Sequence, residues 1–120
     1  MKFIKWVSFS IILASIVLFT SLVLSAHFYD GNELVADMRE NDKADRGDQN
    51  ADFAKAYRFL GYVIGVFDVA DGISFDPPRN ATIGQICTVV ANFLKENPEK
   101  WNLPAANLVI QALQKAFPKK

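Results

Sequence analysis

The sequence predicts an all-α protein: a compact bundle of about four helices preceded by an N-terminal signal peptide or anchor helix. Apolar residues recur every three or four positions over residues 52–70, which is the period of a helix that packs on several sides. Asp30 with Glu33, and Thr82 with Gln85, have the residue types and spacing of helix-capping pairs. No convincing strand pattern interrupts these signals, so we expect a helical fold throughout.

The first 26 residues have the pattern of an export signal. Lys2 and Lys5 precede an uncharged, mainly apolar stretch from Trp6 to Ala26, which ends in small residues. This order is typical of a bacterial secretory signal peptide. Cleavage after Ala26 would leave one domain, residues 27–120, in the periplasm. The alternative is an uncleaved anchor, because a stretch of this length can span a bilayer. The membrane is then a partner only through this segment.

The first helix of the domain is expected to start at the Asp30 cap and to end near Asn41. The polar, acidic segment Glu40–Asp52 follows it. The second helix covers residues 52–70 and carries two apolar stripes. They consist of Phe53, Tyr57, Leu60, Ile64 and Phe67, and of Ala56, Phe59, Val63, Val66 and Ala70. A helix that is apolar over so much of its circumference is expected to be surrounded by other helices.

Two further helices are expected in the second half of the chain. Thr82 and Gln85 would cap the third, which stops before Pro98 because the residue before a proline disfavours helical backbone. The fourth begins at Pro104, since proline suits the first turn of a helix. It ends at Pro118, which cannot continue it.

Gly61, Gly65 and Asp68 share one face of the second expected helix. Glycine is unfavourable in a helix interior, so two on one face predict a close crossing with another helix. Asp68 lies poorly in its own helix dipole and would need outside donors. We interpret it as a structural clamp and not as a catalytic acid, because an acid in catalysis needs a second titratable group nearby.

The domain offers few groups for chemistry. It has one histidine, His27, one cysteine, Cys87, and one serine, Ser74. A nucleophile needs a base in hydrogen-bond reach, and a zinc site needs several nitrogen or sulfur ligands. We therefore expect no catalytic residue, no metal and no cofactor, and we interpret Cys87 as a small core residue. A hydrolase is the least favoured interpretation.

The charge is divided unevenly along the domain. Residues 27–76 contain 11 acids and 5 bases, a net charge of −6, and residues 77–120 contain 6 bases and 2 acids, a net charge of +4. No basic stripe with interleaved aromatic residues is present, which argues against nucleic acid as a partner. The two halves could attract each other within one chain, or the halves of a second copy in a homodimer.

Several segments resemble one family. These are "GNELVADM", "FLGYVIGVFDV" and "TIGQICTVVANFLKENPEKWNLPAANLVIQALQKAFP". Together with the signal they resemble the Rap/Tai family, the periplasmic immunity proteins of the type VI secretion system, from Gly31 to Pro118. The resemblance implies an all-helical, often dimeric protein that binds and occludes a cell-wall amidase effector without catalysis of its own. The alternative is a periplasmic helical domain that binds a non-toxin partner in the cell envelope.

One departure from the family concerns its cysteines. Members commonly carry cysteine pairs, and the resemblance implies that the corresponding positions are Met38, Phe59, Asp76 and Lys119 here. Loss of all four together is what the loss of two disulfides would look like. Apolar residues at two of these positions are compatible with the same fold.

The loop between the second and third helices, Asp71–Asn80, is the first candidate for partner binding. Loops on rigid scaffolds often carry binding residues. Phe75 could fill a pocket on the partner, while Asp76 and Arg79 could fix the register. The alternative is that Phe75 folds back onto the core. The acidic segment Glu40–Asp52 is the next candidate, because opposite charge on a partner would speed encounter.

Overall fold

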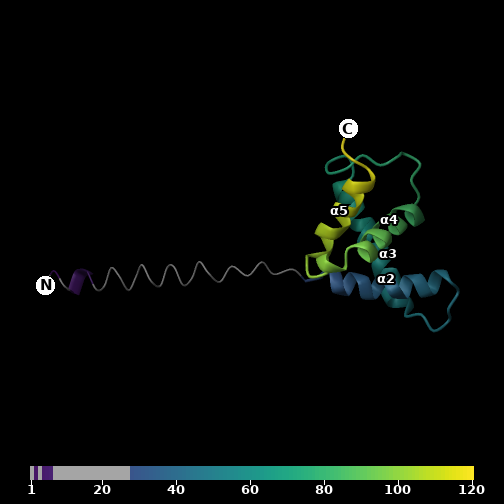
Figure 1. Ribbon diagram of the computed structural model, residues 1–120, viewed down its shortest axis with the longest axis horizontal. Coiled ribbons are helices and arrows are strands. Elements are labelled where there is room, and N and C mark those ends of the chain that lie inside the picture. The colour runs from purple at the N-terminus through teal and green to yellow at the C-terminus, as the bar shows by residue number, and fades with distance from the viewer. Residues whose placement is uncertain (1, 3, 7–27) are drawn as a thin grey trace.

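The computed structural model describes residues 2, 4–6 and 28–120. The predicted export signal lies largely outside the described residues. The domain contains α2 (Gly31–Asp45), α3 (Phe53–Ala70), α4 (Ile83–Glu96), the 3-10 turn η1 (Pro98–Lys100) and α5 (Ala105–Ala116) (Figure 1). The all-α prediction is confirmed. Within the described part of the chain, none of the helices has the length and apolar character needed to cross a bilayer.

The α2 helix begins as predicted and ends later. The Asp30 carboxylate accepts the Glu33 amide at 3.0 Å, and the Glu33 carboxylate accepts the Asp30 amide at 3.1 Å. The expected end near Asn41 is wrong, because polar residues alone do not stop a helix. Gly47, whose φ of 76° favours glycine, follows the true end at Asp45.

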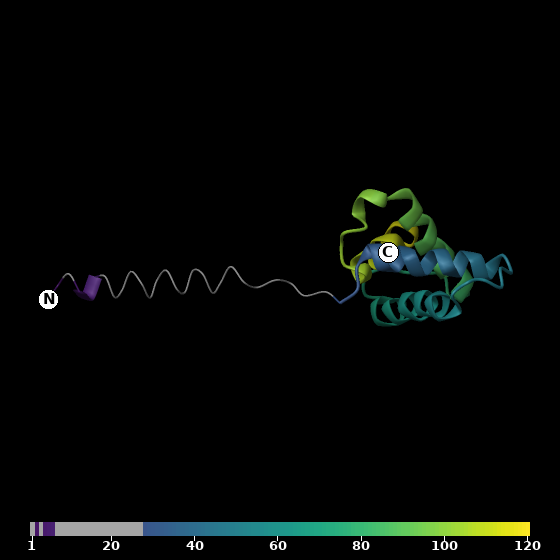
Figure 2. The same ribbon diagram turned by 90° about the horizontal axis from the view of Figure 1, so that it is seen from below.

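The two apolar stripes of α3 are covered to different extents, and only Phe53 and Tyr57 at the start of the first stripe are largely exposed. Ala56, Phe59, Val63 and Ala70 are buried under α2, α4 and α5. Phe53 and Tyr57, at the start of the other stripe, keep 46% and 66% of their surface exposed. Figure 2 shows α3 along the lower edge of the domain, with its outer side bare. The expectation that other helices surround α3 is therefore wrong for a single copy of the chain.

The α4 and α5 helices complete the core. Thr82 and Gln85 form the predicted reciprocal cap of α4, with hydrogen bonds of 2.9 and 3.2 Å. Cys87 lies in the core, as predicted. The largest fully buried side chains come from all four helices and from the loop after α3: Phe59, Phe75, Leu34, Met38, Ile86, Leu94, Leu108, Leu113, Val35, Val63, Val90 and Val109.

The start of α2 is joined to the start of α5. The Gly31 amide donates to the Leu103 carbonyl at 2.9 Å, and the Ala105 amide donates to the Tyr29 carbonyl at 3.0 Å. A Cβ atom on Gly31 would lie 2.5 Å from Leu108 Cδ1 and 2.6 Å from the Trp101 carbonyl oxygen. Glycine is therefore required where the two helices begin. These contacts fix the first turn of α2 against the last helix of the chain.

Candidate partner-binding surfaces

The loop after α3 does not offer its aromatic residue to a partner. Phe75 is 0% exposed and packs on Phe67, with ring centroids 5.5 Å apart. The prediction that Phe75 fills a partner's pocket is wrong, and the alternative that it folds back onto the core is confirmed. The reason is that the loop is short enough for the ring to reach the apolar end of α3, where burial is favourable.

Asp76 is held by the carboxyl-terminal segment. Its carboxylate accepts the Lys120 amide at 2.8 Å and lies 3.2 Å from Lys119 Nζ, while its own amide donates to the Phe117 carbonyl at 3.1 Å. The Lys120 amide, and then the Lys119 ammonium, lower the pKa of Asp76 below its ordinary value. Among the predicted loop residues, Arg79 is exposed and makes no hydrogen bond or ion pair to the described residues.

A buried carboxylate, missed in the sequence, links α2 to α3. Asp37 is fully buried and accepts two hydrogen bonds from Arg58, from Nε at 2.5 Å and from Nη2 at 2.7 Å. The Tyr29 hydroxyl donates a third. Burial, and then the bond to Asp37, raise the pKa of Tyr29, so its hydroxyl remains a donor. The pairing spans 21 residues, and no local pattern in the sequence indicates it.

The outer face of α3 carries an exposed row of residues spaced four apart, which we call the α3 ridge: Phe53, Tyr57, Gly61, Gly65 and Val69. A Cβ atom built on Gly61 or Gly65 meets nothing within 4 Å. The predicted close helix crossing at these glycines is therefore wrong within one copy of the chain, because α5 stands across a hollow from them and not in close contact.

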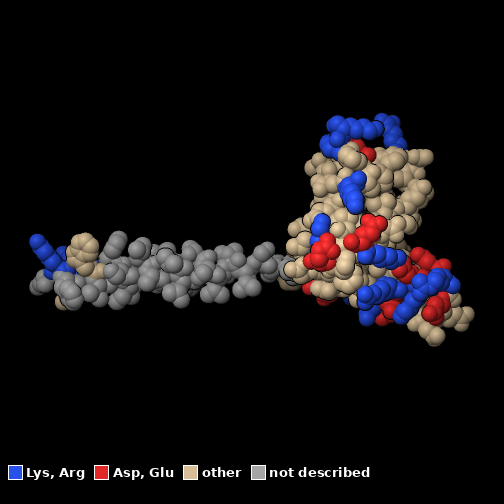
Figure 3. Space-filling view, viewed as in Figure 1, with Lys and Arg blue, Asp and Glu red and all other residues tan. Residues whose placement is uncertain are grey.

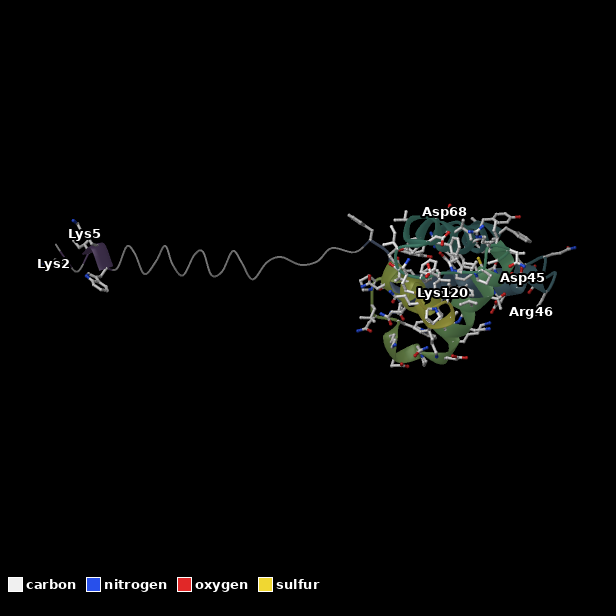
Figure 4. All side chains as sticks on the ribbon, turned by 90° about the horizontal axis from the view of Figure 1, so that it is seen from above. Lys2, Lys5, Asp45, Arg46, Asp68 and Lys120 are labelled. Carbon is white, nitrogen blue, oxygen red and sulfur yellow. The ribbon has the colours of Figure 1, made fainter. Side chains whose placement is uncertain are left out.

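Beside the glycines of the α3 ridge lies an apolar hollow of about 430 Å³ between α3 and α5. Tyr62 and Val66 of α3 and Ala106 and Ile110 of α5 form part of its wall. Asp68 lies on the same outer side of the domain (Figure 4) and has no hydrogen-bond or ion-pair partner among the described residues. The prediction of a structural clamp at Asp68 is thus wrong for the isolated chain.

A larger hollow of about 720 Å³ lies between the end of α2 and α4; its lining is mixed, and we call it the polar hollow because charged and amide side chains stand along both of its sides. Asn41, Asp42 and Asp45 form one side, and Lys95 on the other side pairs with Asp42 at 2.9 Å. Figure 3 shows acidic and basic side chains mixed over this end of α2. The Cys87 thiol lies at this hollow. Burial, and then the Asp45 charge, raise its pKa to about 11, so it is not a thiolate at neutral pH.

The four positions at which the resemblance implied cysteines lie in two kinds of surroundings. Met38 of α2 and Phe59 of α3 are both buried in the core. Asp76 and Lys119 are joined by the ion pair described above. Two buried core residues and one ion pair thus occupy the four positions.

These features define a class of protein. The described residues form a small helical domain. Among them, no group of three or more His, Cys, Asp and Glu side chains is placed to hold a metal ion. The features that distinguish this domain are its exposed surfaces. A family model of Rap1a immunity proteins matches residues 30–118, and the chain belongs to this family. The search of curated proteins returned no match. The protein is an immunity protein, and its partner is a protein effector.

Proposed function

We propose that the chain is exported to the periplasm and there binds and occludes a peptidoglycan amidase delivered by the type VI secretion system. The observation that carries this proposal is the family match over residues 30–118, directly behind a segment with the pattern of an export signal. A cell-wall hydrolase does its damage in the periplasm, so an immunity protein with this leader would meet its effector there.

Occlusion requires a surface on the immunity protein that is complementary to the effector. It does not require a reacting group on the immunity protein. The buried Cys87 has a raised pKa, which makes it a poor nucleophile. The rigid helices and the fixed loop after α3 would lower the entropic cost of binding. We therefore propose that the chain is not an enzyme and that it acts by covering the effector's cleft.

The polar hollow is the surface that we assign to the effector. It is concave, and the acidic segment that the sequence predicted as a contact region forms one of its sides through Asp42 and Asp45. Ile83, which is exposed at the start of α4, adds an apolar contact at the same hollow. An apolar anchor with charged groups around it is the composition of many binding hot spots. Opposite charge on the effector would then orient the encounter.

Protection of cells tests the proposed function. A type VI peptidoglycan amidase that binds the chain, sought first among the products of adjacent genes, would be directed to the periplasm of a test strain, with and without the full-length chain. We expect lysis without the chain and growth with it. A chain that lacks residues 1–26 should remain in the cytoplasm and give no protection. Equal protection by both forms would contradict a periplasmic site of action, and protection by neither would favour a non-toxin partner in the envelope.

Substitutions at the polar hollow test the assigned surface. Asp45→Lys combined with Ile83→Asp should weaken the affinity for the amidase at least about tenfold, because it removes the apolar anchor and reverses a charge beside it. Glu99→Lys reverses an exposed carboxylate outside the hollow and serves as the matched control. Equal affinities of the two folded variants would move the interface to Arg79 and its loop.

A further inference from the structure

Residues 29–31 are fastened to residues 103–105, where the last helix begins. The Ala105 amide donates to the Tyr29 carbonyl at 3.0 Å, and the Gly31 amide donates at 2.9 Å to the carbonyl two residues before Ala105. The two segments run antiparallel, and the bonds between them run in both directions, as in a short two-stranded ladder. We call this pairing the N-terminal clasp.

The Tyr29 side chain ties the clasp to two further helices. Its hydroxyl donates to the buried Asp37 of α2, and its ring lies 4.6 Å from the Tyr62 ring of α3, centroid to centroid. Opening the clasp would take away one donor of a buried carboxylate, which strongly destabilises a fold. It would also disturb Asp30, whose carboxylate caps α2. The clasp is therefore expected to stay closed as long as the domain is folded.

The predicted cleavage site lies next to this clasp in the sequence. Cleavage after Ala26 would leave only His27 and Phe28 between the scissile bond and Tyr29. Two extended residues span about 7 Å at most. Phe28 is 98% exposed and takes no part in the core. A peptidase would therefore have to reach a bond that is tethered close to the surface of the folded domain.

A peptidase needs more free chain than this tether offers. Hydrolysis of the Ala26–His27 amide uses water, whose hydroxyl goes to the new carboxyl group and whose proton goes to the new amine. The enzyme must hold extended chain on both sides of that bond in its own cleft. Cleavage beside folded structure proceeds through a locally opened state, and its rate follows the population of that state. Here the structure that has to open is the clasp.

We propose that the N-terminal clasp sets the order of events in export: once the domain has folded, the clasp withholds the Ala26–His27 bond from signal peptidase. The leader is then removed either before the clasp forms or after it opens. A chain that folds first keeps its leader and stays attached to the membrane through it. The inference rests on the export that is part of the proposed function, and it does not depend on the effector.

Cleavage of the folded full-length chain in detergent micelles by purified bacterial signal peptidase tests the inference. A flexible Gly/Ser spacer of about six residues between Phe28 and Tyr29 adds roughly 20 Å of reach and leaves the clasp intact. We expect this variant to be cleaved at least about tenfold faster than the parent. The same spacer between Gln49 and Asn50, in the exposed turn after α2, is the matched control and should be cleaved as slowly as the parent.

A substitution within the clasp gives a second test. Tyr29→Phe removes the donor to Asp37 and keeps the ring, so the clasp should open more often and the folded chain should be cleaved at least about threefold faster. A peptide of residues 20–33 with the same substitution has no domain to fold, and it should be cleaved at the rate of the parent peptide. Melting curves establish that the parent and the full-length variants are folded at the assay temperature.

Three results would overturn the inference. Equal cleavage rates of the folded parent and the folded Phe28–Tyr29 spacer variant would show that the clasp does not limit access, while the predicted export would still stand. A gain that the Tyr29→Phe peptide shares would place the effect in recognition by the peptidase and not in the clasp. No cleavage of any variant or of the peptide would show an uncleaved anchor, and the predicted cleavage would fail together with this inference.

Discussion

At the scale of single residues, the most consequential group is the buried carboxylate of Asp37. It is surrounded by three donors, two from Arg58 and one from Tyr29, so its charge is compensated without water. The Tyr29 ring also packs against Tyr62, with centroids 4.6 Å apart. The first residues of the domain are thereby fastened to both α2 and α3. A buried charge is tolerated when all its hydrogen-bond partners are present, whereas the removal of one partner strongly destabilises the fold.

Asp37→Ala should lower the free energy of unfolding by about 3 kcal/mol, because it removes three hydrogen bonds and leaves a cavity. Arg58→Ala should be more destabilising than the double variant Asp37→Leu/Arg58→Ala, since only the single variant leaves an uncompensated buried carboxylate. Urea unfolding of the three variants measures these differences. If Arg58→Ala were as stable as the parent, Asp37 would not depend on this pair for its compensation.

Asp76 gives the protein a pH-dependent contact. Its pKa in the folded chain lies below the ordinary value of 3.8. The stabilisation that the ionised Asp76 carboxylate contributes is therefore fully present when the pH is above about that ordinary pKa value. It is lost as the pH falls through the lowered pKa. We expect Asp76→Asn to melt slightly below the parent at neutral pH, and the difference to vanish in acid below that value. Thermal melts across this range test it, and a difference that grows on acidification would reverse the sign we assign.

At the scale of elements, the loop after α3 packs as part of the core and does not project toward a partner. Phe75 is buried against α3, and Asp76 is fastened to the carboxyl-terminal segment. Phe75→Ala should therefore lower the free energy of unfolding by about 3–5 kcal/mol, the usual range for removing a buried aromatic ring. Arg79→Ala, four residues on and exposed, is the matched control and should change stability by less than about 0.5 kcal/mol. Equal melting of the two variants would contradict the burial of Phe75.

Local chemistry explains which elements could be predicted. The Asp30 and Thr82 caps depend on residues three positions away, and prolines mark the ends of α4 and α5, so these features follow from the sequence alone. Which stripe of α3 is more deeply buried could not be predicted, because both stripes have similar composition and the placement of α2, α4 and α5 decides between them. The buried ion pair of Asp37 could not be predicted for a related reason, because its cationic partner lies in the next helix.

At the scale of the whole molecule, the domain begins almost where the predicted signal ends. The Tyr29 carbonyl is bonded to Ala105 and the Tyr29 hydroxyl to Asp37. Only His27 and Phe28 would precede this anchored residue after cleavage following Ala26. We expect the protein isolated from the periplasm to have the intact mass of residues 27–120. A mass that includes Met1, found in the membrane fraction, would show an uncleaved anchor instead.

The proposed function is that this immunity protein binds and blocks a peptidoglycan amidase. Calorimetric titration of the purified candidate amidase with the exported protein, followed by an assay of peptidoglycan cleavage on the same mixture, tests it most directly. We expect saturable binding of one amidase per chain, with a Kd below about 1 µM, and loss of cleavage at saturation. Cleavage that continues undiminished, with no heat of binding from a protein whose melt confirms that it is folded, would contradict the claim.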